Sequence, residues 1–314
     1  MAEAGRGRVL MLFLDGVGLG DRDAGRNPLA AAALPALEEL VGGKLVADTP
    51  ASSRDGAVYR RLDAGLGVEG LPQSATGQTS LLTGVNGAAL MGRHYGPWPG
   101  PTLRRVLERD TPFHQAAGAA ALANAYPEGY FRALEGRRSR ANSPVVAARA
   151  AGVPLIDLEA YRQGQGLGAD VTGEGFTTLD PSLAPISPAD AAARLARLAA
   201  GNAFTFYDVW LTDRYGHQRR HADAVALLEA IDALVSELVP RLEDTTLVLT
   251  SDHGNLEDLS TGRHSLNLVP LLALGPGADA YRPARDLTDV GNVTRRVLGA
   301  GAREPDRSAV NRPA

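Results

Sequence analysis

The sequence predicts an α/β fold with a doubly wound, mostly parallel sheet, and three observations lead to this expectation. Short apolar runs alternate with helical patterns at both ends of the chain. Three of these runs finish at an aspartate, whereas the middle of the chain is rich in glycine, proline and arginine. Ligands of open α/β sheets bind outside the carboxyl ends of the strands, so we expect the three aspartates to converge there.

The three expected strands are continuous apolar runs, a pattern typical of strands that are buried on both faces. Each run delivers a carboxylate into the loop that follows it. The runs and their aspartates are residues 9–14 with Asp15, residues 205–211 with Asp213, and residues 246–250 with Asp252.

Three helices are expected between and after these strands. Residues 222–242 carry apolar side chains at helical spacing, and residues 290–298 form a second helical pattern near the C-terminal end. A further helix over residues 188–200 begins with Ser187 as its N-cap and Pro188 as its first helical residue.

The composition limits the classes of function. The chain has 314 residues, 44% of them hydrophobic, a net charge of −4 and no cysteine. The charge does not indicate nucleic-acid binding, and no apolar run reaches the length of a membrane-spanning helix. We therefore expect a cytoplasmic protein with neither a nucleic-acid nor a membrane partner, and the oligomeric state stays open. Any metal would be held by oxygen and imidazole nitrogen.

Histidines lie beside two of the strand-end aspartates. Asp252 is followed directly by His253, and His217 stands four residues after Asp213. His264 follows in the segment GRHSLNLVP. A mixture of carboxylate and imidazole suits Zn or Mn better than Ca or Mg, so these residues predict a metal site.

Five segments occur in a fixed order along the chain: DGVG, SATGQTSLLTG, TDRYGH, SDHGN and GRHSLNLVP. In this order they resemble the alkaline phosphatase superfamily of metalloenzymes, in the branch with cofactor-independent phosphoglycerate mutase and phosphopentomutase. The resemblance covers both ends of the chain but not its middle. It implies an alkaline phosphatase-like, metal-binding catalytic core from residues 1–86 and 188–314. Residues 87–187 would form a short inserted cap, although residues 102–107 and 119–125 can also be read as core.

The resemblance also implies two divalent metal ions, Mn or Zn, and a division of their ligands. Two ions can clamp both the attacking and the leaving oxygen of an in-line displacement. One ion would be held by Asp213, His217 and His264, and the other by Asp15, Asp252, His253 and the oxygen of the nucleophile.

Ser74 is the expected nucleophile, with Thr76 and Thr79 as alternatives. Ser74 and Gly77 fit the mutase-type pattern, in which Gln78 stands where a histidine is usual. The sulfatase and nucleotide-pyrophosphatase branches place their nucleophile about nine residues before the threonine of an LLTG-like ending. In this sequence that threonine is Thr83, and counting back from it also leads to Ser74. The other interpretation of Ser74 is a helix N-cap without chemistry.

Arginines of the middle segment are candidates for binding the substrate, because guanidinium groups suit phosphoryl oxygens. The other interpretation is an exposed cluster in an arginine-rich protein. The candidates are Arg93, Arg132, Arg137, Arg138 and Arg140.

The expected function is therefore two-metal phosphoryl transfer on a small phosphorylated metabolite, by a phosphomutase or a phosphatase, through a phosphoserine intermediate. Two alternatives remain at this point. One is a phosphodiesterase or sulfatase-like hydrolase, and the other is a catalytically inactive, metal-stabilised binding protein.

Overall fold

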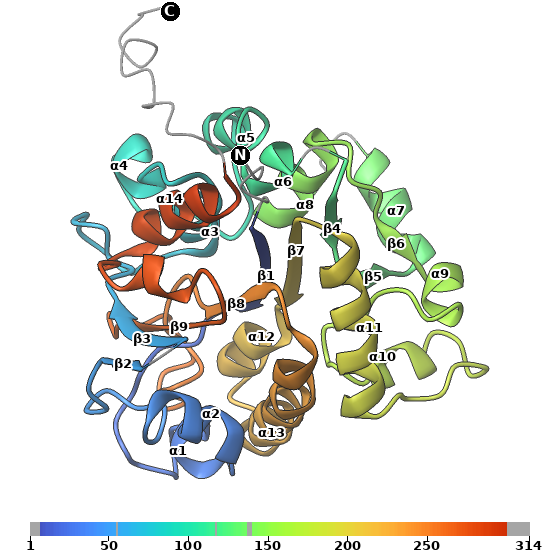
Figure 1. Cartoon of the computed structure of the whole chain (residues 1–314). Helices are drawn as coiled ribbons and strands as arrows, with labels where there is room; N and C mark the ends of the chain where they lie inside the picture. The colour runs from blue at the N-terminus through green and yellow to red at the C-terminus, as the bar shows by residue number, and fades with distance from the viewer. Residues whose placement is uncertain (1–6, 55, 117, 137–139, 300–314) are drawn as a thin grey trace, which may run out of the picture.

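The computed structural model describes residues 7–54, 56–116, 118–136 and 140–299. Its centre is a seven-stranded sheet with helices against both faces, as Figure 1 shows. The α/β class that the sequence predicts is confirmed. In spatial order the strands are β2 (Ser52–Arg54), β3 (Ala57–Leu62), β9 (Val269–Leu274), β8 (Thr245–Thr250), β1 (Arg8–Leu14), β7 (Phe204–Val209) and β4 (Ala120–Leu122).

The strands of the main sheet do not all run in the same direction. β8, β1, β7 and β4 are parallel to one another. β9 is antiparallel to both β8 and β3, so β3 shares the direction of the parallel strands. β2 is antiparallel to β3. Most strands of this sheet therefore run in one direction, and the three that end in aspartates, β1, β7 and β8, are neighbours at its centre.

All three predicted strands are present, with one shorter than expected. β7 ends at Val209 rather than at residue 211, because Trp210 already has helical backbone angles and Leu211 begins the next helix. β9 was not predicted. It contains Pro270, which is typical of edge strands, yet it lies between β8 and β3.

Helices cover both faces because the side chains of the central strands are apolar on both faces. In β1, Met11 and Phe13 join one hydrophobic core, and Leu10 and Leu12 join the other. The first core includes α3 (Ser74–Thr83), α8 (Ser143–Ala150) and α14 (Leu287–Val297), and the second includes α2 (Pro35–Val41), α11 (Pro188–Gly201) and α13 (His221–Leu238). α11, α13 and α14 are the three predicted helices.

Shorter elements complete the described chain. Among the described residues, no helix is both long and apolar enough to cross a bilayer. The shorter helices are α1 (Pro28–Ala31), α4 (Gly87–Met91), α5 (Pro101–Leu107), α6 (Pro112–Gln115), α7 (Glu128–Glu135), α9 (Leu158–Arg162), α10 (Glu174–Thr177) and α12 (Leu211–Gln218), with 3₁₀ turns η1 (Val239–Arg241) and η2 (Ala278–Tyr281). A second sheet pairs β5 (Ala125–Tyr126) with β6 (Ile156–Asp157).

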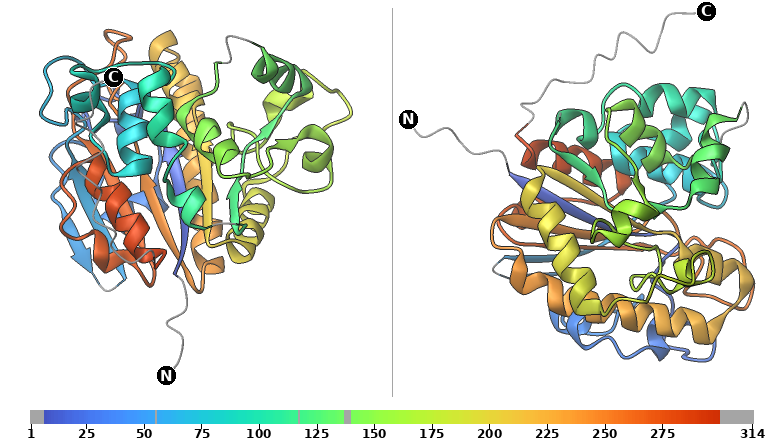
Figure 2. Two further views of the ribbon diagram at one scale, coloured as in Figure 1. Left: turned by 90° about the horizontal axis from the view of Figure 1, so that it is seen from above. Right: turned by 90° about the vertical axis from the view of Figure 1, so that its right-hand side faces the viewer.

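The middle of the chain contributes to the main sheet as well as to a lobe beside it. β4 pairs with β7 as an edge strand, and α5 packs against α3 and α8. The small sheet, α7, α9 and α10 form a lobe at the β4 edge of the main sheet, which Figure 2 shows from two further sides. The cap boundaries at residues 87 and 187 stay a prediction, but β4 and α5 are core elements within that range.

Ser187 caps α11, as the sequence predicts. Its hydroxyl oxygen accepts a hydrogen bond of 3.1 Å from the backbone N–H of Asp190. Replacing Ser187 with alanine is expected to lower the free energy of unfolding by about 1 kcal/mol, because this N–H loses its partner. Urea unfolding followed by circular dichroism measures the change. Ser187→Thr should retain most of the stability, and an unchanged midpoint in Ser187→Ala would contradict the capping role.

Candidate active site

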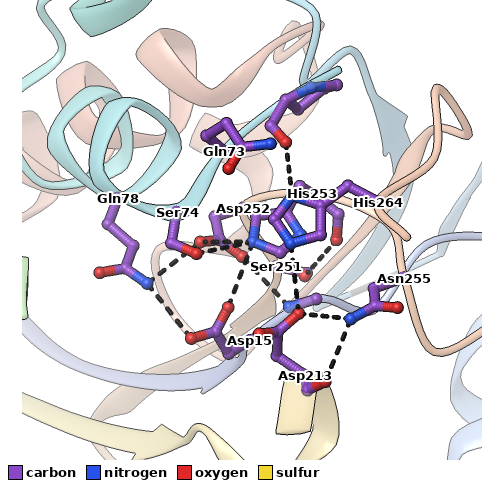
Figure 3. Close-up of polar contacts among 12 residues, drawn as sticks. Asp15, Gln73, Ser74, Gln78, Asp213, Ser251, Asp252, His253, Asn255 and His264 are labelled. Atoms are coloured by element: carbon purple, nitrogen blue, oxygen red, sulfur yellow. Dashed lines mark hydrogen bonds and ion pairs between the residues drawn. The ribbon is translucent and has the colours of Figure 1, made fainter. Parts of the chain in front are cut away.

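The strand-end aspartates and the clustered histidines come together at the carboxyl ends of the parallel strands (Figure 3). Asp15 directly follows β1, and the adjacent pair Asp252 and His253 follows β8. Asp213 lies in the first turn of α12, which follows β7, and His264 comes from the connection between β8 and β9. The fold thus places the predicted ligands at one edge, as strand geometry requires.

The first group of side chains surrounds the Nε2 atom of His253. Ser74 Oγ lies 2.9 Å from this atom, Asp15 Oδ1 lies 3.4 Å from it, and Asp252 Oδ2 lies 3.6 Å from it. Asp252 and His253 are fully buried. The other carboxylate oxygen of Asp252 accepts a hydrogen bond of 3.2 Å from the Gly16 N–H, which fixes the orientation of this side chain.

The second group consists of Asp213, His217 and His264. Asp213 Oδ2 lies 3.3 Å from His217 Nε2, and Asp213 Oδ1 lies 3.6 Å from His264 Nε2. The two Nε2 atoms are 3.2 Å apart. Asn255 donates a hydrogen bond of 2.6 Å from Nδ2 to Asp213 Oδ1 and holds this carboxylate in place.

The hydrogen bonds of His217 and His264 orient their rings so that a positive charge is favourable between the two Nε2 atoms. Nδ1 of His264 faces the Pro72 carbonyl oxygen at 2.7 Å, and Nδ1 of His217 faces that of Gly262 at 3.0 Å. A carbonyl oxygen only accepts, so each Nδ1 carries a hydrogen atom. The neutral rings would then point two Nε2 lone pairs at each other. A proton or a metal ion between these atoms removes the conflict.

The pKa shifts of His217 and His264 agree with a single positive charge shared by the two rings. The hydrogen bond to Asp213 raises the pKa of His217 to about 9, whereas burial lowers the pKa of His264 to about 4. His217 therefore carries a proton on Nε2 when no metal is bound, and His264 keeps its lone pair. A metal ion would take the place of that proton, which is the usual linkage between metal binding and proton release.

The first group carries an excess of buried negative charge. Burial, together with the charges of Asp252 and Asp213, raises the pKa of Asp15 well above its ordinary value. Burial also raises the pKa of Asp252. Among the described residues, Asp15 Oδ1 has no hydrogen-bond partner. Carboxylates in this situation are stabilised by a bound cation.

Both groups therefore fit divalent metal ions. Potential ligand atoms of Asp213, His217 and His264 lie within 4.8 Å of one another, and the same holds for Asp15, Asp213 and His253. Oxygen and imidazole ligands are suitable for Mn or Zn. Asp213 belongs to both of these sets of ligand atoms. Its carboxylate could therefore contact either ion, whereas the resemblance assigns it to one.

The geometry distinguishes the three candidate nucleophiles. Ser74 is the first residue of α3, and Gln73 rather than Ser74 is the N-cap. Thr76 Oγ1 donates to the Gln73 carbonyl at 3.0 Å, and Thr79 Oγ1 donates to the Ala75 carbonyl at 2.6 Å. These two hydroxyls are fully buried within the helix, whereas the hydroxyl of Ser74 faces His253.

A glycine lets α3 approach the ligands closely. A Cβ atom at Gly77 would lie 2.7 Å from the Asp252 carbonyl oxygen, which is too close for any larger residue without movement of the backbone. The Ser-x-x-Gly spacing is therefore explained by packing, because Gly77 brings the first turn of α3 against the loop after β8.

The predicted substrate arginines have different positions. Arg140 lines the cavity beside Ser74, with its guanidinium carbon 4.9 Å from the centre of the Trp98 ring. Arg93 lies over Tyr95, and Arg132 pairs with Glu128 on the exposed side of α7. Neither of these two lines the cavity. Arg137 and Arg138 lie outside the described residues. Arg214 lines the cavity and was not predicted, although it directly follows the predicted ligand Asp213.

Three polar residues that support the site were not predicted as site residues. Asn255 orients Asp213, as described above. Glu257 accepts hydrogen bonds from the N–H groups of Gly18 at 2.9 Å and Asn255 at 2.8 Å, and so joins the loops after β1 and β8. Gln78 Nε2 donates to Asp15 at 3.3 Å and to Asp252 at 3.1 Å. The position of Gln78 within the motif was the one available signal.

Replacing Gln78 with alanine is expected to weaken metal binding by about 10- to 100-fold, the usual effect of removing a hydrogen bond to metal ligands. Without the amide, Asp15 and Asp252 are less well oriented and bind protons more strongly. Competition with a fluorescent chelator measures the affinity. Gln163→Ala, at an exposed position far from the ligands in sequence, is the matched control. Equal affinities for the two variants would contradict this role of Gln78.

The fold and the clustered ligands define a metalloenzyme-type α/β protein, and comparison with known families agrees. Residues 179–299 match the family model of the Metalloenzyme superfamily. The matched region contains Asp213, His217, Asp252, His253 and His264. Together with the similarities described next, this match supports the resemblance of the chain to the alkaline phosphatase superfamily of metalloenzymes, in its mutase-like branch.

The curated relatives are mutases, and the similar solved structures share the fold. A phosphopentomutase of Methylobacterium radiotolerans is 35% identical over an alignment of 108 residues, which covers 33% of this chain and 27% of that protein. A 2,3-bisphosphoglycerate-independent phosphoglycerate mutase of Halobacterium salinarum is 35% identical over an alignment of 97 residues, which covers 28% of this chain and 19% of that protein. The chain spans about one fifth to one third of the length of the curated relatives it matches.

Two solved structures resemble the chain along most of its length. The PH0037 protein from Pyrococcus horikoshii has a TM-score of 0.60 at 15% identity, covering 96% of this chain and 100% of that one. The alkaline phosphatase from the Antarctic bacterium TAB5 has a TM-score of 0.54 at 12% identity, covering 95% and 99%. At these identities the similarity shows a common fold.

Proposed function

We propose that this protein transfers a phosphoryl group from a small phosphorylated substrate through a phosphoserine formed on Ser74, with two divalent metal ions, Mn or Zn. The observation that supports this most directly is the 2.9 Å contact between Ser74 Oγ and His253 Nε2, at a point where Asp15 and Asp252 also converge. A hydroxyl at the centre of a group of metal ligands is the arrangement that an activated nucleophile needs.

One ion would be held by Asp213, His217 and His264, and the other by Asp15, Asp252, His253 and Ser74. Bound metal ions would lower the pKa of the Ser74 hydroxyl and neutralise charge on the transferring phosphoryl group. Ser74 is also the first residue of α3, so the positive end of the helix dipole faces the oxygen that becomes negatively charged.

The first step would transfer the phosphoryl group from the substrate to Ser74. Ser74 Oγ loses its proton and forms a bond to phosphorus, while the bond between phosphorus and the oxygen of the leaving alcohol breaks. That oxygen takes up a proton, and the phosphoryl group remains on Ser74. In a phosphatase, water then removes the phosphoryl group, and in a mutase another hydroxyl of the retained alcohol takes it.

A small phosphorylated substrate is supported by the names of the relatives, which are mutases of phosphopentoses and phosphoglycerates. The absence of cysteine fits the cytoplasm, which is the location we propose. Both mutase and phosphatase activity are compatible with the same first step, and the fate of the phosphoserine separates them.

Phosphodiester hydrolysis is the second candidate, and one observation favours it. Ser74, Pro97 and Asp213 line two cavities, one of about 500 Å³ and another of about 370 Å³ that also includes Arg263. A phosphorus atom bound at Ser74 could therefore carry a substituent on either side.

A screen of the metal-loaded protein tests the proposal. The protein is stripped of metal, reconstituted with Mn or Zn, and assayed against phosphosugars, phosphoglycerates, p-nitrophenyl phosphate and bis-p-nitrophenyl phosphate. We expect metal-dependent turnover of monoesters. Preference for the diester would favour the second candidate, and failure to turn over any ester with both metals bound would contradict phosphoryl transfer.

A further inference from the structure

The cavity of about 500 Å³ beside Ser74 is lined by five aromatic rings in addition to Asp15 and Asp213. Aromatic residues are only 5% of the chain, and the chain has two tryptophans. Both tryptophans line this cavity, so aromatic side chains are concentrated there. The aromatic lining residues are Trp98, Tyr126, Tyr130, Phe176 and Trp210.

These rings come from separate parts of the chain. Tyr126 and Tyr130 stack with their centres 4.5 Å apart and an angle of 15° between the ring planes. Trp98 and Trp210 are 40% and 38% exposed, although large apolar side chains are usually covered. A planar group that enters the cavity would cover the exposed surface of these two side chains and remove apolar surface from water.

The side-chain amides of Asn124 and Asn142, which line the cavity, already form hydrogen bonds with other groups of the protein. Asn124 donates from Nδ2 to the Asp208 carbonyl at 2.7 Å and accepts from the Asp208 N–H at 2.8 Å. Asn142 donates to the Asp208 carboxylate at 2.8 Å and accepts from the Val145 N–H at the start of α8. Each amide thus uses one of its two N–H groups and one of its two oxygen lone pairs within the protein, which halves its capacity to recognise the hydroxyls of a sugar or of a glycerate.

The size and the charge of the cavity agree with a ring-bearing phosphoester. About 500 Å³ lies within the usual range for sites that bind small organic ligands. Ser74 and Asp213 are part of the lining, so the phosphoryl group would react within this cavity, and Arg140 and Arg214 provide the positive charges of the lining. A substrate with its phosphoryl group at Ser74 would direct its alcohol portion towards the rings.

We propose that this cavity binds a planar aromatic ring on the alcohol side of the substrate, so that the substrate class is a phosphomonoester of a ring-bearing alcohol. A nucleoside monophosphate and an aryl or arylmethyl phosphate share this chemistry. Phosphoglycerates and free pentose phosphates lack it. This inference rests on the proposed function of Ser74, because it assumes that the phosphoryl group reacts there.

Matched pairs of substrates test the ring directly. Adenosine 5′-monophosphate and ribose 5-phosphate share a primary phosphate on ribose and differ in the base. Benzyl phosphate and cyclohexylmethyl phosphate have equal numbers of carbon atoms and differ in planarity. With the Mn-loaded protein we expect kcat/KM to favour the planar member by about 10- to 100-fold, the range for stacking of one base on aromatic side chains. A preference in the first pair alone indicates a nucleoside, and one in both pairs indicates any planar ring. Equal values in both pairs would overturn the inference.

Variants of Trp98 connect the preference to the cavity. Trp98→Ala should reduce the preference by about 10-fold, whereas Trp98→Phe should retain most of it. Leu179→Ala is the control, because Leu179 is 60% exposed and does not line the cavity. A ring preference that survives unchanged in Trp98→Ala would also contradict the assignment.

A binding measurement separates failure of this inference from failure of the proposed function. Both tryptophans line the cavity, so their fluorescence reports on binding without any reaction. Adenosine should change this emission in a saturable manner, and ribose should not. If no ester is turned over but adenosine produces the change, phosphoryl transfer is wrong and the ring site stands. If esters are turned over without ring preference, the inference fails and the proposed function stands.

Discussion

Replacing Ser74 with alanine is expected to abolish turnover of phosphomonoesters while the protein keeps both metal ions. Loss of a serine nucleophile commonly reduces kcat by several orders of magnitude, and we expect a loss of at least about 10⁴-fold. The metal content should persist because the proposed ligands Asp15, Asp252 and His253 would remain to hold the ion nearest to Ser74. Steady-state kinetics and elemental analysis of the same preparation measure the two quantities.

Thr76→Ser provides the matched control, since it keeps the hydroxyl that donates to the Gln73 carbonyl within α3. This variant should retain most of the activity. Residual turnover of Ser74→Ala above about 10% of the wild-type value would exclude Ser74 as the nucleophile. In that case Thr76 and Thr79 would need to be tested in the same way.

Replacing His264 with alanine is expected to remove one of two bound metal ions and to lower kcat by about 10³-fold. The expected loss follows from the several kcal/mol that a metal ion contributes to stabilising charge in the transition state. His264 Nε2 faces both Asp213 and His217, so its removal leaves the second group with two ligands. Elemental analysis should give about one ion per chain instead of two.

His221→Ala is the matched control for this experiment. His221 hydrogen-bonds the Ala24 carbonyl at 2.8 Å and belongs to neither group of ligands. Its replacement should leave the metal content unchanged. His217→Ala should behave like His264→Ala. Because His217 is exposed whereas His264 is partly buried, His217→Ala still tests the site if His264→Ala fails to fold. Two ions in both ligand variants would contradict the proposed site.

The parts of the fold that could be predicted are those in which local sequence determines the structure. β1, β7 and β8 are short, mainly apolar runs that are almost entirely buried, so their sequences predict buried strands without knowledge of their neighbours. β9 was missed because Pro270 argues against an internal strand, and its pairing with β3 depends on contacts that are distant in sequence. β4 is only three residues long and depends on β7 to complete its hydrogen bonds.

The site shows the same difference between local and tertiary information. Asp252 and His253 are adjacent in sequence, and Asp213 and His217 are one helical turn apart, so both pairs were visible as motifs. The contacts of Gln78 with Asp15 and Asp252 span 63 and 174 residues and could not be read from any spacing. The aromatic cavity was missed for the same reason, because its rings come from segments with no common periodicity.

The central claim is that a phosphoryl group is transferred to Ser74, and trapping of the phosphoenzyme tests it most directly. The Mn-loaded protein is mixed with substrate, quenched in acid within the first turnover, digested and analysed by mass spectrometry. We predict one phosphoryl group on the peptide that contains Ser74, located on Ser74 itself and absent from Ser74→Ala. A phosphoryl group on Thr76 or Thr79, or turnover with no phosphorylated peptide at any quench time, would contradict the claim.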